Sequence, residues 1–268
     1  MAQHDPDQMS DDQLFENWAG WITRTAAELT EVFEHRYLFN SIRDMFDYNP
    51  KLHTESGQFV MEWQARLYGR DVLLFVRREF DTQPGTNNTL KLLGEMESRP
   101  KILSRARYRA FFDKLAMSEE PKNGLANSFF NSFRIVGDGK SHDDYLDPAG
   151  IAVEREVLKE RIQAVLLYAN RNLAHRTPEW EASPIVVPKD TDNALFAVQE
   201  CFDKFYPLVT GRSMPEPTPA IQFDWEDAFR HAWMPSDVAE RISLAEQARR
   251  EARSLAVIDE IKNRGNVE

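Results

Sequence analysis

The 268-residue sequence contains one cysteine, Cys201, which excludes a disulfide framework and a zinc site built from cysteines. It also lacks any apolar run near the roughly 20 residues that a membrane-spanning helix needs. The first residues, MAQHDPDQMSDD, have neither the basic nor the apolar region of a secretion signal. These absences predict a soluble, cytoplasmic protein.

Positive charge is scarce as well, because 33 lysines and arginines stand against 44 aspartates and glutamates, for a formal net charge of −11. Neutralisation of phosphates dominates the affinity of proteins for duplex nucleic acid, so this balance argues against tight non-specific binding to duplexes. It remains compatible with a local basic groove. Hydrophobic residues make up 42% of the chain, which predicts a globular protein with a substantial core.

The usual sequence signatures of catalysis are absent. There is no phosphate loop, no dinucleotide-binding glycine pattern, no H-E-x-x-H zinc pattern and no G-x-S-x-G nucleophile elbow. The segment SHDDYLD gathers His142 with Asp143, Asp144 and Asp147. An acidic, solvated loop is the simpler interpretation of this segment, with a metal site as the alternative. We therefore expect no cofactor and no metal.

Helical periodicity dominates the chain, and strand patterns are almost absent. Ser10 and Gln13 have the spacing of a capping box. Apolar residues then recur every three or four positions until Asn49, which predicts one N-terminal helix of about 37 residues, some 55 Å long. A break between residues 34 and 40 is compatible with the pattern, although no proline or glycine marks one.

The rest of the chain predicts shorter helices. Asp147 before Pro148 is a good N-cap followed by proline at the first helical position, and Pro178 ends the helix that starts there. Turn-forming residues at 118–124 predict a break, and 125–136 is either a short helix or a packed loop. The other helices are expected over 57–80, over 90–97 with Asn88 or Thr89 as cap, over 102–117, from Thr191 or Asp192 to a C-cap at Gly211, and over 237–262.

The predicted fold is therefore all-α: an antiparallel helical bundle of six to eight helices with a long N-terminal helix. Residues 10–211 form the bundle. Residues 212–268 are more polar and are expected to form a C-terminal helical extension that packs on the bundle or projects from it.

The stretch YANRNLAHRTP at 168–178 is the most suggestive candidate site. A helix turns by about 100° per residue, so Arg161, Tyr168, Arg171 and His175 are predicted to lie on one side of this helix. The apolar residues fall largely on another side, which predicts a core face: Leu158, Ile162, Val165, Ala169 and Leu173. A guanidinium one turn below an imidazole can hold a phosphate while the imidazole moves a proton, and RNA supplies its own 2′-hydroxyl nucleophile. The structural alternative is that these cations cap free carbonyls at a helix C-terminus.

A second candidate is the basic stretch RPKILSRARYRAFFDK at 99–114. Lys101, Arg105 and Arg109 recur every four residues, which predicts a positive stripe if the stretch is one helix. The aromatic residues interleaved with them are Tyr108, Phe111 and Phe112. Such a combination can bind single-stranded RNA through phosphate pairing and base stacking. The alternative is a solvated face over buried aromatic residues.

The segment LDPAGIAVEREVLKERIQAVLLYANRNLAHR resembles the HEPN superfamily of helical proteins, and within it the abortive-infection branch. A looser similarity runs upstream through YLFNSIRDMFDYNP and LLFVRREFDTQPGTNNTLKLL, so that it covers about residues 10–210. The resemblance implies a metal-independent endoribonuclease in a toxin or antiphage-defence setting, commonly acting as a homodimer. Other members of the superfamily only bind RNA or protein, and a protein partner or antitoxin is a further implication.

The resemblance also implies roles for single residues. His175 matches the catalytic histidine of the superfamily and would act as general acid and base. The family's arginine precedes that histidine by a longer interval than here, where three residues separate Arg171 from His175. Arg171 would stabilise the transition state, and Asn170 would orient the scissile group. The residues expected to bind RNA, from their chemistry rather than from the resemblance, are Arg161, Tyr168, Lys101, Arg105 and Arg109. Two alternatives remain open: a non-catalytic helical protein-interaction module, and an enzyme with a small-molecule site inside the bundle.

Overall fold

The computed structural model describes residues 8–80, 88–113, 118–171 and 188–216, together with Leu244, Gln247, Ala248 and Glu251. The chain divides into two units, Met1–Pro219 and Ala220–Glu268. In the second unit the four described residues are helical, and the Gln247 amide donates a hydrogen bond to Glu251 at 3.0 Å. The fold described below is that of the first unit.

Helix α1 (Asp11–Tyr48) begins with the predicted capping box. The Ser10 hydroxyl accepts a hydrogen bond from the Gln13 N–H at 3.3 Å, and the Gln13 carboxamide accepts one from the Ser10 N–H at 2.9 Å. The helix then continues unbroken for 38 residues to its C-cap at Asn49. The prediction of one long N-terminal helix is confirmed, and the break considered between residues 34 and 40 does not occur.

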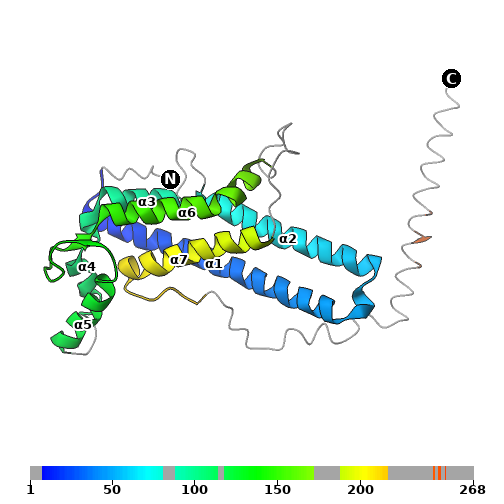
Figure 1. Ribbon diagram of the computed structural model, residues 1–268, viewed down its shortest axis with the longest axis horizontal. Coiled ribbons are helices and arrows are strands. Elements are labelled where there is room, and N and C mark those ends of the chain that lie inside the picture. The colour runs from blue at the N-terminus through cyan, green and yellow to red at the C-terminus, as the bar shows by residue number, and fades with distance from the viewer. Residues whose placement is uncertain are drawn as a thin grey trace, which may run out of the picture. The chain divides into compact units, whose positions relative to one another are not determined.

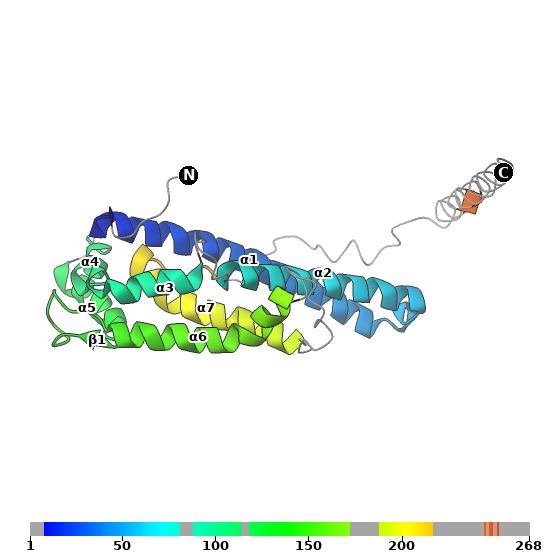
Figure 2. The ribbon, with the colours of Figure 1, turned by 90° about the horizontal axis from the view of Figure 1, so that it is seen from above.

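Antiparallel helices pack around α1 to form a bundle (Figure 1). Helix α1 packs against α2 (Glu55–Phe80) and α7 (Pro188–Thr210), while α6 (Pro148–Ala169) packs against α2, α7 and α3 (Thr89–Ser98). Figure 2 shows that α3 continues in the direction in which α2 ends, so these two helices together form one side of the bundle. The predicted all-α antiparallel bundle is confirmed. Among the described helices, none combines the length and apolar character needed to cross a bilayer.

One continuous hydrophobic core joins the bundle helices. Trp18 of α1 is fully buried, and its indole N–H donates to the Glu95 carboxylate at 2.9 Å. The core face of α6 is the one that the sequence predicts, since four of its five expected residues are buried and the fifth lies outside the described residues. The buried residues of that face are Leu158, Ile162, Val165 and Ala169.

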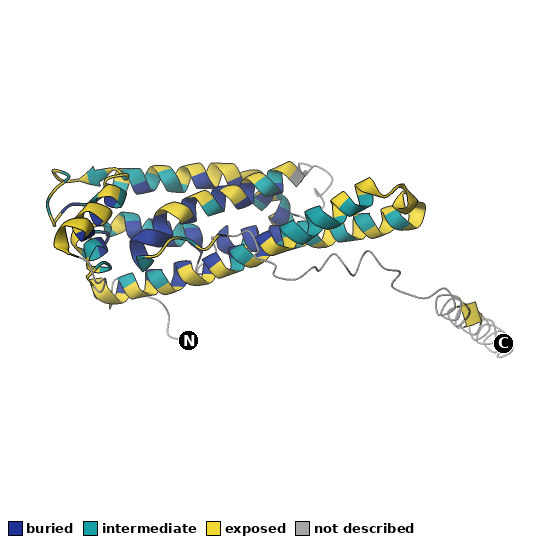
Figure 3. Cartoon of the chain, turned by 90° about the horizontal axis from the view of Figure 1, so that it is seen from below, coloured by how far each residue is buried: buried dark blue, intermediate teal, exposed yellow. Residues whose placement is uncertain are grey.

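Beyond the core, α1 and α2 run on together as a two-helix hairpin (Figures 1 and 3). The last buried residue of α1 is Phe33, and the first buried residue of α2 is Val72. We call residues 34–71 between them the hairpin arm. Its two helices contact each other through partly buried side chains; the rings of Phe39 and Tyr68, for example, stack with centroids 4.9 Å apart. The short helix η2 (Pro50–Leu52) closes the arm.

Short elements gather at the opposite end of the bundle, around the N-terminus of α6. They are η3 (Pro100–Ile102), α4 (Arg105–Ala110), α5 (Glu119–Phe130) and the strands β1 (Ile135–Val136) and β2 (Tyr145–Leu146). The strands pair antiparallel, with Ile135 opposite Leu146 and Val136 opposite Tyr145. As predicted, Asp147 caps α6: its carboxylate accepts from the Ala149 N–H at 3.0 Å.

Three predictions of helix boundaries are wrong, and each error involves a proline. The single helix expected over 102–117 is split, because Pro100 opens a 3-10 turn and Ser104 then caps a new six-residue helix by accepting from the Arg107 N–H. The break expected at 118–124 is the first half of α5, where Pro121 lies in the first turn and needs no hydrogen-bonded N–H. Helix α7 starts at Pro188, earlier than expected, for the same reason.

Glu79 is a buried carboxylate in α2, and it gives the fold a testable pH dependence. Its side chain accepts hydrogen bonds from the hydroxyls of Thr25 and Thr89, both at 3.1 Å. Burial raises the pKa of Glu79 above its ordinary value of 4.5, against the opposing effect of these two hydrogen bonds. The native state therefore holds this proton more tightly than the unfolded chain. The resulting stabilisation is present below the unfolded pKa and is lost as pH rises through the native pKa.

Glu79→Gln removes this titration. We expect the free energy of unfolding of wild type to fall relative to that of the variant as pH rises from about 4 through the raised native pKa, by about 1.4 kcal/mol for each unit by which the pKa is raised. Urea unfolding at intervals across this range measures the difference. Glu62→Gln, at an exposed position of the same helix, is the control and should run parallel to wild type. A constant difference between wild type and Glu79→Gln would contradict the raised pKa.

Candidate functional site

The candidate catalytic residues lie where α6 ends. Asn170 is the C-cap of α6, and its backbone N–H bonds to the carbonyls of Leu166 and Leu167. Its side chain is exposed, and that of the following Arg171 is half-buried. His175 lies outside the described residues. The structure thus places two of the three predicted catalytic residues next to each other, directly after the helix whose core face is buried.

Arg161 and Tyr168, the other predicted residues of this face, have partners within the bundle. The Arg161 guanidinium forms an ion pair with Glu200 of α7, with one nitrogen–oxygen distance of 3.3 Å. The hydrogen bond from Arg161 lowers the pKa of Glu200 below its ordinary value. Tyr168 is partly buried and packs against the core. Arg161 would therefore have to exchange Glu200 for a phosphate in order to bind RNA.

Lys101, Arg105 and Arg109 do not form the predicted stripe. Lys101 lies in η3 and the two arginines in α4, so the spacing of four residues no longer places Lys101 on the face that Arg105 and Arg109 share. All three also lie near the N-terminal end of α6, because the backbone N–H of Leu146 bonds to the carbonyl of Leu103. Arg171 lies just beyond the other end of α6, a helix of 22 residues, and directly follows the C-cap Asn170. The two candidate regions therefore do not form one site.

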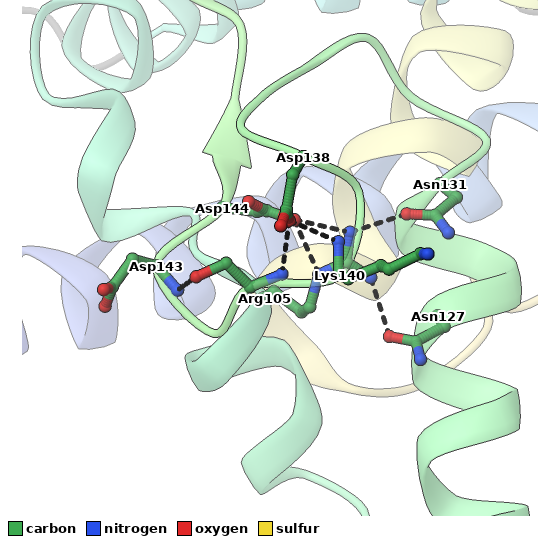
Figure 4. A network of polar contacts seen from close by, with 8 residues as sticks. Arg105, Asn127, Asn131, Asp138, Lys140, Asp143 and Asp144 are labelled. Atoms are coloured by element: carbon green, nitrogen blue, oxygen red, sulfur yellow. Dashed lines mark hydrogen bonds and ion pairs between the residues drawn. The ribbon is translucent and has the colours of Figure 1, made fainter.

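Arg105 is not available to RNA, because it is buried and fully engaged (Figure 4). Its side chain is 3% exposed and forms an ion pair at 3.1 Å with Asp144, which is 1% exposed. The same guanidinium donates to the carboxamide oxygens of Asn127 at 2.7 Å and Asn131 at 2.6 Å. It also lies over the Phe130 ring, 4.9 Å from the centroid. The prediction of Arg105 as an RNA-binding residue is wrong; it ties α4 to α5 and to the loop before β2.

Neither asparagine of this cluster was predicted from the sequence. Asn127 and Asn131 are four residues apart, so they lie on one face of α5 and its C-cap, and this spacing was the available signal. Arg109 is similarly engaged, in ion pairs with Asp113 and Glu119 and in a hydrogen bond at 2.7 Å to Asn123. Only Lys101 of the three basic residues is exposed and has no ion pair with another described residue.

The acidic segment at 141–147 does not converge on a metal. Asp144 points to Arg105, whereas Asp147 caps α6 and pairs with Arg134 at 2.5 Å. No group of three or more histidine, cysteine, aspartate or glutamate residues in the described ranges has the geometry to hold a metal ion. Cys201 is buried, and burial raises the pKa of its thiol to about 12, so that it is a neutral thiol at physiological pH rather than a nucleophile.

A pocket of about 360 Å³ lies beside the N-terminal end of α6. Its charged lining residues are matched in two ion pairs: Lys204 with Glu154 at 2.7 Å, and Arg134 with Asp147. Because each cation has an anion, the pocket offers no excess charge to a phosphate. It also lies at the other end of α6 from Asn170 and Arg171, so it is not part of the candidate catalytic site.

Comparison with known proteins identified no relative of this chain: no family model matches the sequence, and neither a curated protein nor a solved structure matches it.

Proposed function

We propose that this protein is a HEPN-like, RNA-associated protein that cleaves RNA without a metal ion at the C-terminal end of α6. The observation that supports this proposal is the state of Arg171. The other arginines predicted for RNA contact are all ion-paired: Arg105, Arg109 and Arg161. Arg171 forms no ion pair with another described residue, and it is half-buried beside the exposed Asn170.

The proposed reaction is a transesterification. His175 takes the proton from a ribose 2′-hydroxyl, whose oxygen attacks the adjacent phosphorus. The bond from phosphorus to the 5′-oxygen breaks, and the leaving 5′-oxygen receives a proton from the imidazolium. The products are a 2′,3′-cyclic phosphate and a free 5′-hydroxyl. Arg171 stabilises the charge on the phosphorane-like transition state, and Asn170 orients the scissile phosphate.

Purified protein incubated with total RNA in the presence of a chelator tests this proposal. We expect cleavage by wild type, a loss of about 100-fold or more in His175→Ala, because general acid–base catalysis contributes that much, and a similar loss in Arg171→Ala. Arg43→Ala, at an exposed position of the hairpin arm, is the control and should cleave as wild type does. An inactive wild-type protein, or unchanged cleavage by His175→Ala, would sink the proposal.

A second candidate function, a protein-interaction module, is favoured by a different observation. The hairpin arm exposes large apolar side chains to solvent: Tyr48, Phe59, Val60, Trp63 and Leu67. Single exposed apolar residues are ordinary on protein surfaces, but a contiguous group marks an interaction site.

A further inference from the structure

The pocket of about 360 Å³ lies between the segment that joins α5 to β1, the first two turns of α6 and the C-terminal half of α7 (Figure 2). Its floor is apolar, because three of its lining residues belong to the buried core: Leu146, Ile151 and Phe205. Phe133 also lines the pocket and packs against that core. Ligand pockets have volumes of about 300–1,000 Å³, so this pocket fits a small molecule with an apolar part.

Charged groups of both signs line the rest of the pocket. Lys204 of α7 donates to both carboxylate oxygens of Glu154 of α6 at 2.7 Å, and Arg134 pairs with Asp147 at 2.5 Å. An uncharged apolar ligand would cover these four groups and offer them no partner, which is costly. A ligand with a single charge would meet a like charge together with its counter-ion. A ligand with one group of each sign can pair with both kinds of side chain.

The two ion pairs leave bonding capacity for such a ligand. Lys204 is the one basic partner of Glu154 among the described residues, and a carboxylate offers about four acceptor positions. In the same described ranges Asp147 is the one acidic partner of Arg134, and a guanidinium carries five N–H donors. Both side chains reach solvent, with Arg134 70% and Glu154 34% exposed. They can therefore pair with a ligand without giving up their present partners.

The first turn of α6 does not compete for the negative group of a ligand. Its backbone N–H groups are already occupied by Asp147, whose carboxylate accepts from Ala149 at 3.0 Å. The carbonyl of Asp147 accepts from Gly150 at 2.9 Å and from Ile151 at 3.2 Å. The first residue of the helix is a proline, which has no N–H. An anion in the pocket therefore pairs with a side chain rather than with the helix N-terminus.

We propose that this pocket binds an α-amino acid with an apolar side chain. The carboxylate of the ligand pairs with Arg134, because the planar guanidinium matches a carboxylate in shape. The ammonium of the ligand pairs with Glu154, and its side chain lies on the apolar floor. The pocket is at the other end of α6 from Asn170 and Arg171, so this inference is independent of the proposed ribonuclease activity.

Isothermal titration calorimetry of the full chain with L-phenylalanine and L-leucine measures this binding. We expect a dissociation constant on the order of 100 μM for at least one of them, in keeping with ligands of about a dozen non-hydrogen atoms. Failure of both amino acids to bind at about 10 mM overturns the proposal.

Analogues that lack one charge test the need for both. For L-phenylalanine these are 3-phenylpropionate and phenethylamine, and for L-leucine they are 4-methylpentanoate and isoamylamine. Each analogue of the tighter amino acid should bind at least about tenfold more weakly, because it loses one charge-assisted hydrogen-bonded pair. An analogue that binds as tightly as its parent amino acid overturns the proposal.

A pair of variants tests the role of Glu154. Glu154→Gln should weaken binding of the amino acid at least about tenfold. Glu156→Gln is the matched control, since it makes the same change at an exposed position of the same helix outside the pocket, and it should bind as wild type does. Because Glu154→Gln leaves Lys204 without its anion, this variant should bind the carboxylate-only analogue more tightly than wild type does. Unchanged affinity of Glu154→Gln for the amino acid overturns the proposal.

Gly150→Met tests the location of the ligand, because it fills the pocket and leaves its charged groups in place. A β-carbon at Gly150 would lie 3.4 Å from the β-carbon of Arg134, which is an ordinary contact, and the methionine side chain is flexible. The variant should lose binding, whereas Ala149→Met, at the neighbouring exposed position, should keep it. Circular dichroism establishes that the variants keep the helical content of wild type. A folded Gly150→Met protein that binds as tightly as wild type overturns the proposal.

Discussion

Replacing Arg105 by alanine is expected to lower the free energy of unfolding by about 3–5 kcal/mol, since it leaves a buried carboxylate without its counter-ion. Asp144, at 1% exposure, has no access to water that could replace the guanidinium. Asn127 and Asn131 lose a hydrogen-bond donor in the same step. Domains are typically stable by only 5–15 kcal/mol in total, so the variant should unfold at a much lower denaturant concentration than wild type.

Two further variants separate the buried ion pair from a general effect of removing arginine. Arg43→Ala breaks an exposed contact with Asp44 and should change the free energy of unfolding by no more than about 0.5 kcal/mol. The double variant Arg105→Ala with Asp144→Ala should recover part of the loss, because no unpaired charge remains buried. Urea unfolding monitored by circular dichroism measures all four proteins. An Arg105→Ala protein as stable as wild type would show that the pair is not buried.

Gly137→Ala is expected to destabilise the same end of the bundle by several kcal/mol. The backbone of Gly137 has a φ of 136°, which an L-residue rarely adopts. A β-carbon built there would lie 1.8 Å from a carboxylate oxygen of Asp144. Asp144 cannot move away without leaving Arg105. The substitution therefore combines backbone strain of about 1–3 kcal/mol with disruption of the buried ion pair.

Gly139 provides the matched control for this prediction. Its φ is 80°, also positive, but a β-carbon there meets no atom within 4 Å. Gly139→Ala should therefore show the cost of backbone strain alone, about 1 kcal/mol. Thermal and urea unfolding measure the free energy of unfolding of each variant, and the two values should differ by the cost of the clash with Asp144. Equal stabilities for Gly137→Ala and Gly139→Ala would contradict it.

Much of the bundle is predictable from the sequence because its helix caps and its apolar periodicity indicate the same helices and the same buried faces. The capping box of Ser10, the cap at Asp147 and the core face of α6 all follow from side chains that act within one turn of their own backbone. Gly211 ends α7 as expected, with a φ of 66° and its N–H bonded to the carbonyl of Pro207. The helix boundaries that were predicted wrongly lie where a proline is at the start of a helix instead of after its end. The presence of proline alone does not tell these two positions apart.

The candidate site is harder to predict, because the partners of a charged side chain are set by tertiary packing. The sequence pattern of Arg105 is the same whether the guanidinium faces solvent or Asp144, a residue 39 positions away. Arg161 likewise pairs with Glu200 of α7, and the periodicity of the segment around Arg161 does not predict that α7 packs beside it. Helical spacing places residues on a face, but only the packing of other helices decides which face is free.

The hairpin arm has an energetic consequence for the long helix α1. Protection of backbone amides from hydrogen exchange follows the free energy of the smallest opening that exposes them. Between Leu14 and Phe33 that opening must disrupt the hydrophobic core, whereas beyond Phe33 no residue of α1 is buried. Amides of the arm can therefore exchange when α1 separates from α2 there and the turns of the arm unwind, while the bundle stays intact. A single uninterrupted 38-residue helix thus spans two cooperative units with different opening free energies.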